Sequence, residues 1–146
     1  SLLSWPHEIP FFNVAAGGAE SGMRLLSDSN LDWGQDLPLL ADWHQRHPDV
    51  PLYLAYFGST DPHYYGIDYL NLPGGYPFSD VPIVTKSVPG VMAISATYLQ
   101  GVYDDGRLDK QLAYLRTQKP REVFGGSIYL FEWDPVAFDE FRLSHP

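Results

Sequence analysis

Hydrophobic residues occur along the chain in two kinds of run, which predict two kinds of element. Continuous apolar runs are typical of buried strands, and runs with apolar residues three or four apart are typical of helices packed on one face. The strand-like runs lie at 23–28, 51–57, 90–96 and 126–133, and the helix-like runs at 34–46 and 108–118. This alternation predicts an α/β fold, layered around a mostly parallel sheet of four strands or slightly more, with helices packed on it.

Proline and aspartate mark the ends of these elements. Pro38 is acceptable only in the first turn of a helix, and Pro48 ends the same helix. Asp134-Pro135 predicts a further short helix that reaches about Phe141, with Asp134 as its N-cap. Because a strand, a helix and a second strand follow one another between residues 23 and 57, we expect a right-handed crossover between two parallel strands.

The segment 59–89 differs from the rest of the chain in its turn-forming residues. Asp61-Pro62 and Pro73-Gly74-Gly75 are turn signals, and tyrosine is frequent in the segment. We expect a long excursion with little regular structure. Loops of this length in a compact domain are often functional.

Composition narrows the class of protein. With 146 residues, 45% of them hydrophobic, the chain is long enough for a single soluble domain, 1–146, with one core. The net charge of −9, from 18 acidic and 9 basic residues, opposes binding to nucleic acid or to an anionic membrane surface. The chain has no cysteine, which excludes disulfides, thiolate metal sites and cysteine nucleophiles.

The first 18 residues are unusual for a chain end, because ends are usually polar and frayed. They start without methionine and hold an apolar, proline-interrupted segment that includes Trp5, Phe11 and Phe12. We interpret residues 1–18 as an aromatic-rich lead-in strap that follows a missing membrane region. The alternative is that these rings pack on the core of this same domain.

The densest group of polar side chains lies between the first strand and the first helix. Asp28, Asn30 and Asp32 stand at alternate positions, as in the first half of a calcium-binding loop, where oxygen ligands wrap a hard cation. The pattern then breaks, because Trp33 replaces the glycine of the sixth position and Leu39 the glutamate of the twelfth. We predict no metal site, and we favour the interpretation that these side chains cap the following helix and satisfy turn amides.

Other candidate chemistry is weak. His44 and His47 stand three apart near a helix end, where histidines more often complement the helix C-terminus than bind zinc. The chain has no nucleophile elbow, phosphate loop or dinucleotide fingerprint. Aspartates at 28, 32, 36 and 61 could pair for acid–base chemistry, and the aromatic share of 15% suits either a sugar-stacking surface or a small core.

Several segments together resemble one family. They are Asp28–Leu37, Tyr56–Gly58 with Asp61-Pro62 and Tyr64–Ile67, and Ala93–Thr97 with Leu99–Tyr103. They are similar to the C-terminal soluble region of bacterial membrane glycosyltransferases, the relatives of protein O-mannosyltransferases and aminoarabinose transferase that use polyprenyl-phosphate sugars. The start of the chain resembles the segment that follows the last membrane helix of these enzymes, so the likeness covers nearly the whole chain.

The resemblance implies an extracytoplasmic domain on the outer face of the cytoplasmic membrane, as part of a larger membrane protein. In that superfamily the catalytic acid and the lipid-linked donor belong to the membrane part, so no catalytic residue and no cofactor carries over to this chain. The implied partners are the missing transmembrane domain of the same protein and a glycan or polyprenyl-linked sugar, and not nucleic acid.

Three functions stay open at this point. The first is an accessory domain of such a glycosyltransferase, which shapes the acceptor side or binds glycan and is not catalytic in isolation. The second is a stand-alone carbohydrate-binding module. The third is a small hydrolase that uses the aspartates.

A ligand site is expected at one edge of the sheet. In parallel sheets, ligands bind at the carboxyl ends of the strands, where loops and helix N-termini converge. The candidate ligand-binding residues in the polar segments after three of the expected strands are Asp28, Asn30, Asp32, Trp33, Gln35, Asp36, Asp61, Tyr64, Tyr65, Thr97 and Gln100. Trp33 with Tyr64 or Tyr65 would stack on a sugar ring. The alternative is that this edge docks on the missing membrane domain.

Overall fold

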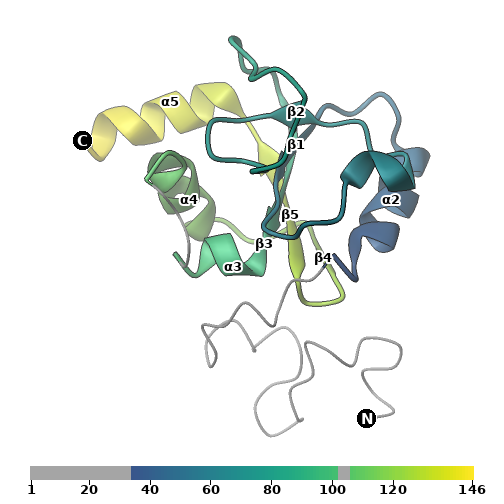
Figure 1. Cartoon of the computed structure of the whole chain (residues 1–146). Helices are drawn as coiled ribbons and strands as arrows, with labels where there is room; N and C mark the ends of the chain where they lie inside the picture. The colour runs from purple at the N-terminus through teal and green to yellow at the C-terminus, as the bar shows by residue number, and fades with distance from the viewer. Residues whose placement is uncertain (1–33, 102–105) are drawn as a thin grey trace, which may run out of the picture.

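One five-stranded sheet organises the chain, whose computed structural model describes residues 34–101 and 106–146 (Figure 1). The strands are β1 (Leu52–Ala55), β2 (Leu70–Asn71), β3 (Gly90–Ser95), β4 (Glu122–Phe124) and β5 (Ile128–Trp133). Their order across the sheet is β2-β1-β3-β5-β4. The expected α/β fold is confirmed.

The strands are parallel in one half of the sheet and antiparallel in the other. β2, β1 and β3 run in the same direction, and Leu54 of β1 pairs with Asn71 on one side and with Ala93 on the other. β5 runs antiparallel to β3, and β4 antiparallel to β5. The expectation of a mostly parallel four-stranded sheet is therefore only partly right.

The short strand β4 explains the difference. After β3, the chain passes through two helices to β4, and the turn 125–127 returns it as β5, which lies between β3 and β4. A turn this short joins only antiparallel strands, whereas a parallel connection needs about a dozen residues or more. Residues 126–133 are expected as one strand of a mostly parallel sheet, without β4 before them, because the three residues of β4 form no distinct apolar run.

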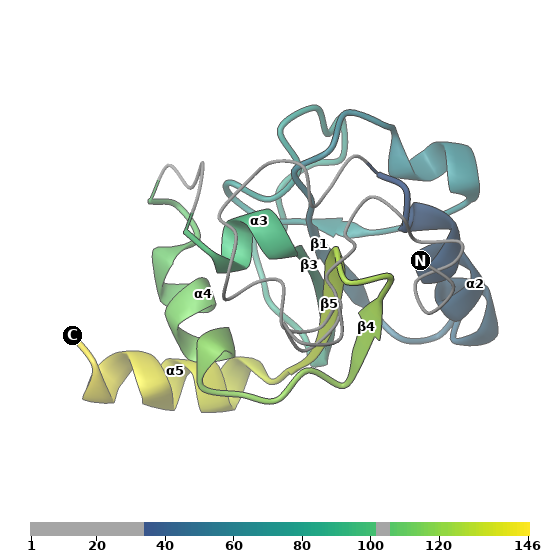
Figure 2. The same cartoon turned by 90° about the horizontal axis from the view of Figure 1, so that it is seen from below.

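Helices cover both faces of the sheet (Figures 1 and 2). They are α2 (Leu37–Arg46), the 3₁₀ helix η4 (Pro62–Tyr65), α3 (Ala96–Leu99), α4 (Asp109–Arg116) and α5 (Pro135–Ser144). α2 and η4 lie on one face, and α3, α4 and α5 lie on the other. The helices expected at 34–46, at 108–118 and after Asp134 are confirmed. Within the described residues, no helix is both long and apolar enough to cross a membrane.

Two expectations about the N-terminal part lie outside the described residues. One is the strand near 23–28, together with its crossover to the next strand. The other is the lead-in strap at 1–18.

The core formed by residues 34–101 and 106–146 consists of two apolar clusters, one on each face of the sheet. Met92 and Ile94 belong to the cluster under α3 and α4, whereas Val91 and Ala93, which alternate with them, belong to the cluster under α2. Alternate side chains of a strand point to opposite faces. Because both faces of β3 are buried, this strand appears in the sequence as a continuous apolar run.

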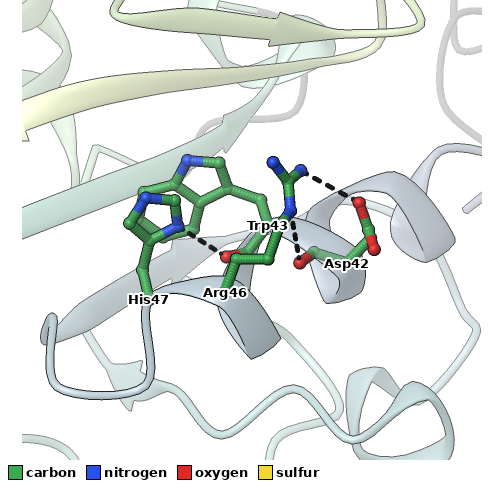
Figure 3. Close-up of polar contacts among 4 residues, drawn as sticks. All are labelled: Asp42, Trp43, Arg46 and His47. Atoms are coloured by element: carbon green, nitrogen blue, oxygen red, sulfur yellow. Dashed lines mark hydrogen bonds and ion pairs between the residues drawn. The ribbon is translucent and has the colours of Figure 1, made fainter.

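His47 caps the C-terminal end of α2 (Figure 3). The ring of His47 stacks on the ring of Trp43 with 4.3 Å between centroids, and its Nδ1 lies 2.8 Å from the Trp43 carbonyl oxygen. In its Nδ1–H form, His47 thus donates a hydrogen bond to a carbonyl group of the last turn, as expected for a residue that complements a helix C-terminus. On the exposed side of the same end of α2, Arg46 pairs with Asp42, one turn earlier in the helix, at 2.9 Å.

The segment 59–89 is largely irregular, as expected, but it also extends the sheet. β2 pairs with β1, and the chain then turns and comes to lie beside β2, where Ile83 forms a parallel bridge with Asn71. There, the Val84 N–H donates to the Asn71 carbonyl oxygen at 3.1 Å, and the Asn71 side-chain amide donates to the Val81 carbonyl oxygen at 2.9 Å. The expectation of little regular structure therefore missed an edge strand.

Candidate functional site

Several polar side chains meet at the carboxyl edge of the sheet, where β1 and β3 end. The backbone N–H of Phe57 donates to Oγ of Ser95 at 3.0 Å, which ties the chain after β1 to the end of β3. Thr97 is fully buried, and its hydroxyl oxygen has no hydrogen-bond partner among the described residues. Thr97 therefore offers no exposed surface to a ligand.

A buried carboxylate lies at the same edge, at the start of α2. Asp36 is fully buried and accepts a hydrogen bond from Oγ of Ser127 at 2.6 Å. Ser127 belongs to the turn between β4 and β5 and is also fully buried. Gly125 in the same turn has a φ of +57°, and a Cβ there would overlap the Asp36 carboxylate. Asp36 therefore joins α2 to the β4–β5 hairpin.

Part of the predicted site cannot be placed. Asp28, Asn30, Asp32 and Trp33 lie outside the described residues. Gln35 is half-buried just before α2, and Gln100 is half-buried as the C-cap of α3.

The remaining candidates belong to η4, on the face of the sheet that α2 covers. Asp61 caps this short helix, since its carboxylate accepts a hydrogen bond from the His63 N–H at 2.9 Å. Tyr64 and Tyr65 form an edge-to-face pair with 5.2 Å between ring centroids. Tyr64 is 82% exposed, so its ring is open to a ligand or a partner.

A pocket of about 320 Å³ opens at the carboxyl end of β2, beside β1. Its lining comes from the turn after β2, from the segment that lies beside β2, from α3 and from the chain before α4. The lining residues are Asn71, Leu72, Gly74, Gly75, Tyr76, Pro77, Ser79, Ile83, Tyr98 and Arg107. None of them is a ligand-binding candidate of the sequence analysis. No carboxylate belongs to this described lining, although the chain as a whole is acidic.

Two glycines let the turn after β2 lie close to the sheet. Gly74 has a φ of +78°, in the left-handed region that favours glycine. A Cβ at Gly75 would come within 2.7 Å of the Leu54 carbonyl oxygen in β1. The Pro73-Gly74-Gly75 signal in the sequence thus marks one wall of the pocket.

Asn71 supplies a buried amide to the pocket lining. The residue is only 7% exposed, and its Nδ2 donates to the Val81 carbonyl oxygen at 2.9 Å. Its Oδ1 is buried and accepts no hydrogen bond within the described part of the chain. Leaving a buried acceptor without a donor costs about 1–3 kcal/mol. A water molecule or a ligand hydroxyl at this oxygen would therefore be favoured.

Two tyrosines next to the pocket keep their protons over a wider pH range than usual. Burial raises the pKa of Tyr76 above its ordinary value near 10, and the negative charge of Asp61 raises it further. Burial also raises the pKa of Tyr69. The hydrogen bond with Ser79 offsets part of this rise, whereas the negative charges of Asp80 and Asp61 add to it, so the pKa of Tyr69 is raised as well. Both phenol groups therefore stay protonated to a higher pH than exposed tyrosines do.

A second pocket, of about 480 Å³, lies at the opposite edge of the sheet. It is lined near the starts of β1 and β2 by His44, Asp49 and Asp68, together with apolar residues. No group of three or more histidine, aspartate or glutamate side chains that could hold a metal ion occurs within residues 34–101 and 106–146.

Comparisons of the chain with protein-family models, with curated proteins and with solved structures found no match.

Proposed function

We propose that this chain is an extracytoplasmic accessory domain of a bacterial membrane glycosyltransferase and that it binds a sugar in the pocket after β2. The observation that carries the binding part is the chemistry of the lining. A sugar presents hydroxyl groups that donate and accept hydrogen bonds, and C–H faces that pack on aromatic rings. The pocket lining includes the amide of Asn71, the hydroxyl of Ser79 and the rings of Tyr76 and Tyr98, of which both rings are more than nine-tenths buried and can meet a ligand only along a narrow edge.

The place and size of the pocket support a small ligand. Ligands of open α/β sheets bind outside the carboxyl ends of parallel strands, and this pocket opens beside the parallel strands β2 and β1. Its volume of about 320 Å³ is near the lower end of the range for small-molecule sites, roughly 300–1,000 Å³. A single sugar unit therefore fits this pocket better than a long chain does.

The proposal assigns no catalysis to this chain alone. Asp36 and Asp61 are the described candidates for acid–base chemistry, and their carboxylates accept hydrogen bonds from Ser127 and from the backbone of His63. In the larger protein, the reaction and the lipid-linked donor would belong to the transmembrane part. This domain would hold glycan on the acceptor side.

A titration followed by NMR tests sugar binding. The ¹⁵N-labelled chain is titrated with the methyl glycosides of glucose, galactose, mannose and N-acetylglucosamine. At least one of them is expected to shift the amide signals of residues 71–76 and of Tyr98. Shifts confined to the opposite edge, around His44 and Asp68, would contradict the proposed site. An absence of shifts with all four glycosides would favour docking on the membrane part instead.

The native gene tests the membrane part of the proposal. Its open reading frame is expected to encode several hundred residues upstream of this domain, with multiple hydrophobic segments long enough to span a bilayer. A reading frame without such segments, combined with sugar binding, would favour the stand-alone carbohydrate-binding module.

A further inference from the structure

We infer that Asn71 selects the ligand of this pocket by accepting a hydrogen bond from one ligand hydroxyl at its Oδ1. This inference rests on the proposed sugar-binding function and makes it more specific. It assigns to the pocket a ligand with a free hydroxyl at one position, and it excludes an analogue that lacks that hydroxyl or carries it as an O-methyl ether.

The orientation of the Asn71 amide is fixed by the fold. Its Nδ2 donates to the carbonyl oxygen of Val81 at 2.9 Å. Turning the amide by 180° would place Oδ1 against that carbonyl oxygen, so that two acceptors would face each other. The backbone of Asn71 is also held on both sides, by pairing with Leu54 in β1 and by the hydrogen bond from the Val84 N–H. Position 71 therefore presents an acceptor in a constant direction.

Oδ1 of Asn71 is the buried side-chain acceptor of this lining that the described residues leave without a donor. A Cβ at Gly75 would lie 3.3 Å from it, which is a tight contact, so glycine at this position lets the turn pass close to the acceptor without a side chain that covers it. A fixed, desolvated acceptor discriminates strongly, because an analogue without the hydroxyl leaves it unpaired. A backbone carbonyl group on a flexible loop would discriminate less between the ligand and its deoxy analogue, because it could turn toward another donor.

The test compares two variants with the wild-type chain. Asn71→Leu removes both the acceptor and the amide donor and keeps a side chain of similar size. Asn71→Asp keeps an oxygen acceptor and loses the donor to Val81. Asp68→Asn, in the pocket at the opposite edge, is the control for unspecific effects. The ¹⁵N–¹H spectrum of each variant first establishes that the fold is kept.

The probes are the methyl glycoside that binds the wild type most tightly among the four named above, and its monodeoxy and mono-O-methyl derivatives. On the wild type, one deoxy derivative is expected to bind about tenfold more weakly than its parent, and the parent is expected to shift the side-chain NH₂ signals of Asn71. On Asn71→Leu, the parent should bind about tenfold more weakly, and the same deoxy derivative should show no further loss. Asn71→Asp should keep the preference for the parent, and Asp68→Asn should behave as the wild type.

The possible failures are distinguishable. If none of the four glycosides binds the wild type, the proposed sugar binding is wrong, docking on the membrane part becomes the better account, and the proposed role of Asn71 is wrong as well. If a glycoside binds at the carboxyl edge and Asn71→Leu keeps both the affinity and the preference for the parent, the proposed function stands and the role of Asn71 is wrong. A loss with Asn71→Leu that is equal for the parent and for every derivative would show a structural role in place of a selective contact.

Discussion

Among single residues, Gly125 is a position where an added methyl group should be costly, because φ is positive and the buried carboxylate of Asp36 occupies the space beside it. Gly125→Ala is expected to lower the free energy of unfolding by about 2–5 kcal/mol, from backbone strain at positive φ together with overpacking. Gly66→Ala is the matched control, since Gly66 has a φ of +73° and open space around it. This control should cost about 1–2 kcal/mol. Urea unfolding measures both, and equal losses would contradict the close contact.

The tyrosines beside the pocket predict how stability depends on alkaline pH. Below pH 10, their hydroxyls are protonated in the folded and the unfolded chain, and the full stability is present. Because burial raises the pKa of Tyr69 and Tyr76 in the folded state, the unfolded chain loses these protons first as the pH rises above about 10, and stability falls. Tyr76→Phe should make this fall less steep in urea unfolding from pH 9 to 11. An unchanged slope would contradict the assignment, and Tyr64→Phe, at an exposed ring, is the control.

The sequence singles out two aspartates, Asp36 and Asp134, but it predicts the structural role of only one of them. Asp36 was a ligand candidate because it ends a polar string, but the structure buries it against Ser127, 91 positions away. A contact between residues so far apart leaves no local pattern. Asp134, in contrast, was assigned correctly as a cap, because its partner, the Val136 N–H at 2.9 Å, lies within the same helix.

The C-terminal helix α5 is the element that should respond most to the loss of a cap, because none of its residues is buried. Its main packing contacts are the rings of Phe138 and Phe141 against Tyr114. Asp134→Ala should destabilise α5 by about 1 kcal/mol. Amide hydrogen exchange in α5 should then become roughly fivefold faster, while exchange in α4 stays unchanged.

The control for this prediction is Asp139→Ala, which removes an exposed ion pair with Arg142 and leaves the cap intact. Exposed pairs contribute only about 0–1 kcal/mol, so a smaller effect is expected. If both variants exchange at the same rate, the cap does not determine the stability of α5.

At the scale of elements, the length of each helix or strand determined whether the sequence could predict it. The helices at 37–46 and 109–116 were visible because their apolar residues recur with the helical period. The strands β1, β3 and β5 were visible because both of their faces are buried. β2 has two residues and β4 has three, so neither produces a pattern of its own. Without β4, the sequence gives no reason to expect the antiparallel hairpin that makes β5 run against β3.

At the scale of the whole molecule, the carboxyl edge was the right place to look for a pocket, but its residues could not be predicted. The rule for parallel strands needs only the direction of β1, β2 and β3. The lining, however, combines the turn after β2 with Tyr98 and Arg107, which come from later parts of the chain. Only the fold brings these segments together. The pocket also lies at the end of β2, a strand of two residues that forms no recognisable pattern in the sequence.

The acidity of the whole molecule makes its response to calcium a useful test. Millimolar calcium is expected to leave the melting temperature unchanged. The string at residues 28–39 lacks a complete ligand set, because Leu39 stands where a calcium loop needs a bidentate glutamate, and Trp33 replaces the glycine of its sharp turn. A cation that bound only the folded chain, at 100 times its Kd, would add about 2.7 kcal/mol to the free energy of unfolding, which raises the melting temperature by several degrees.

Magnesium at the same concentration is the control, because screening of the net charge of −9 would affect both titrations alike. A rise with calcium alone, reversed by a chelator, would show that Asp28, Asn30 and Asp32 bind the ion despite the broken pattern.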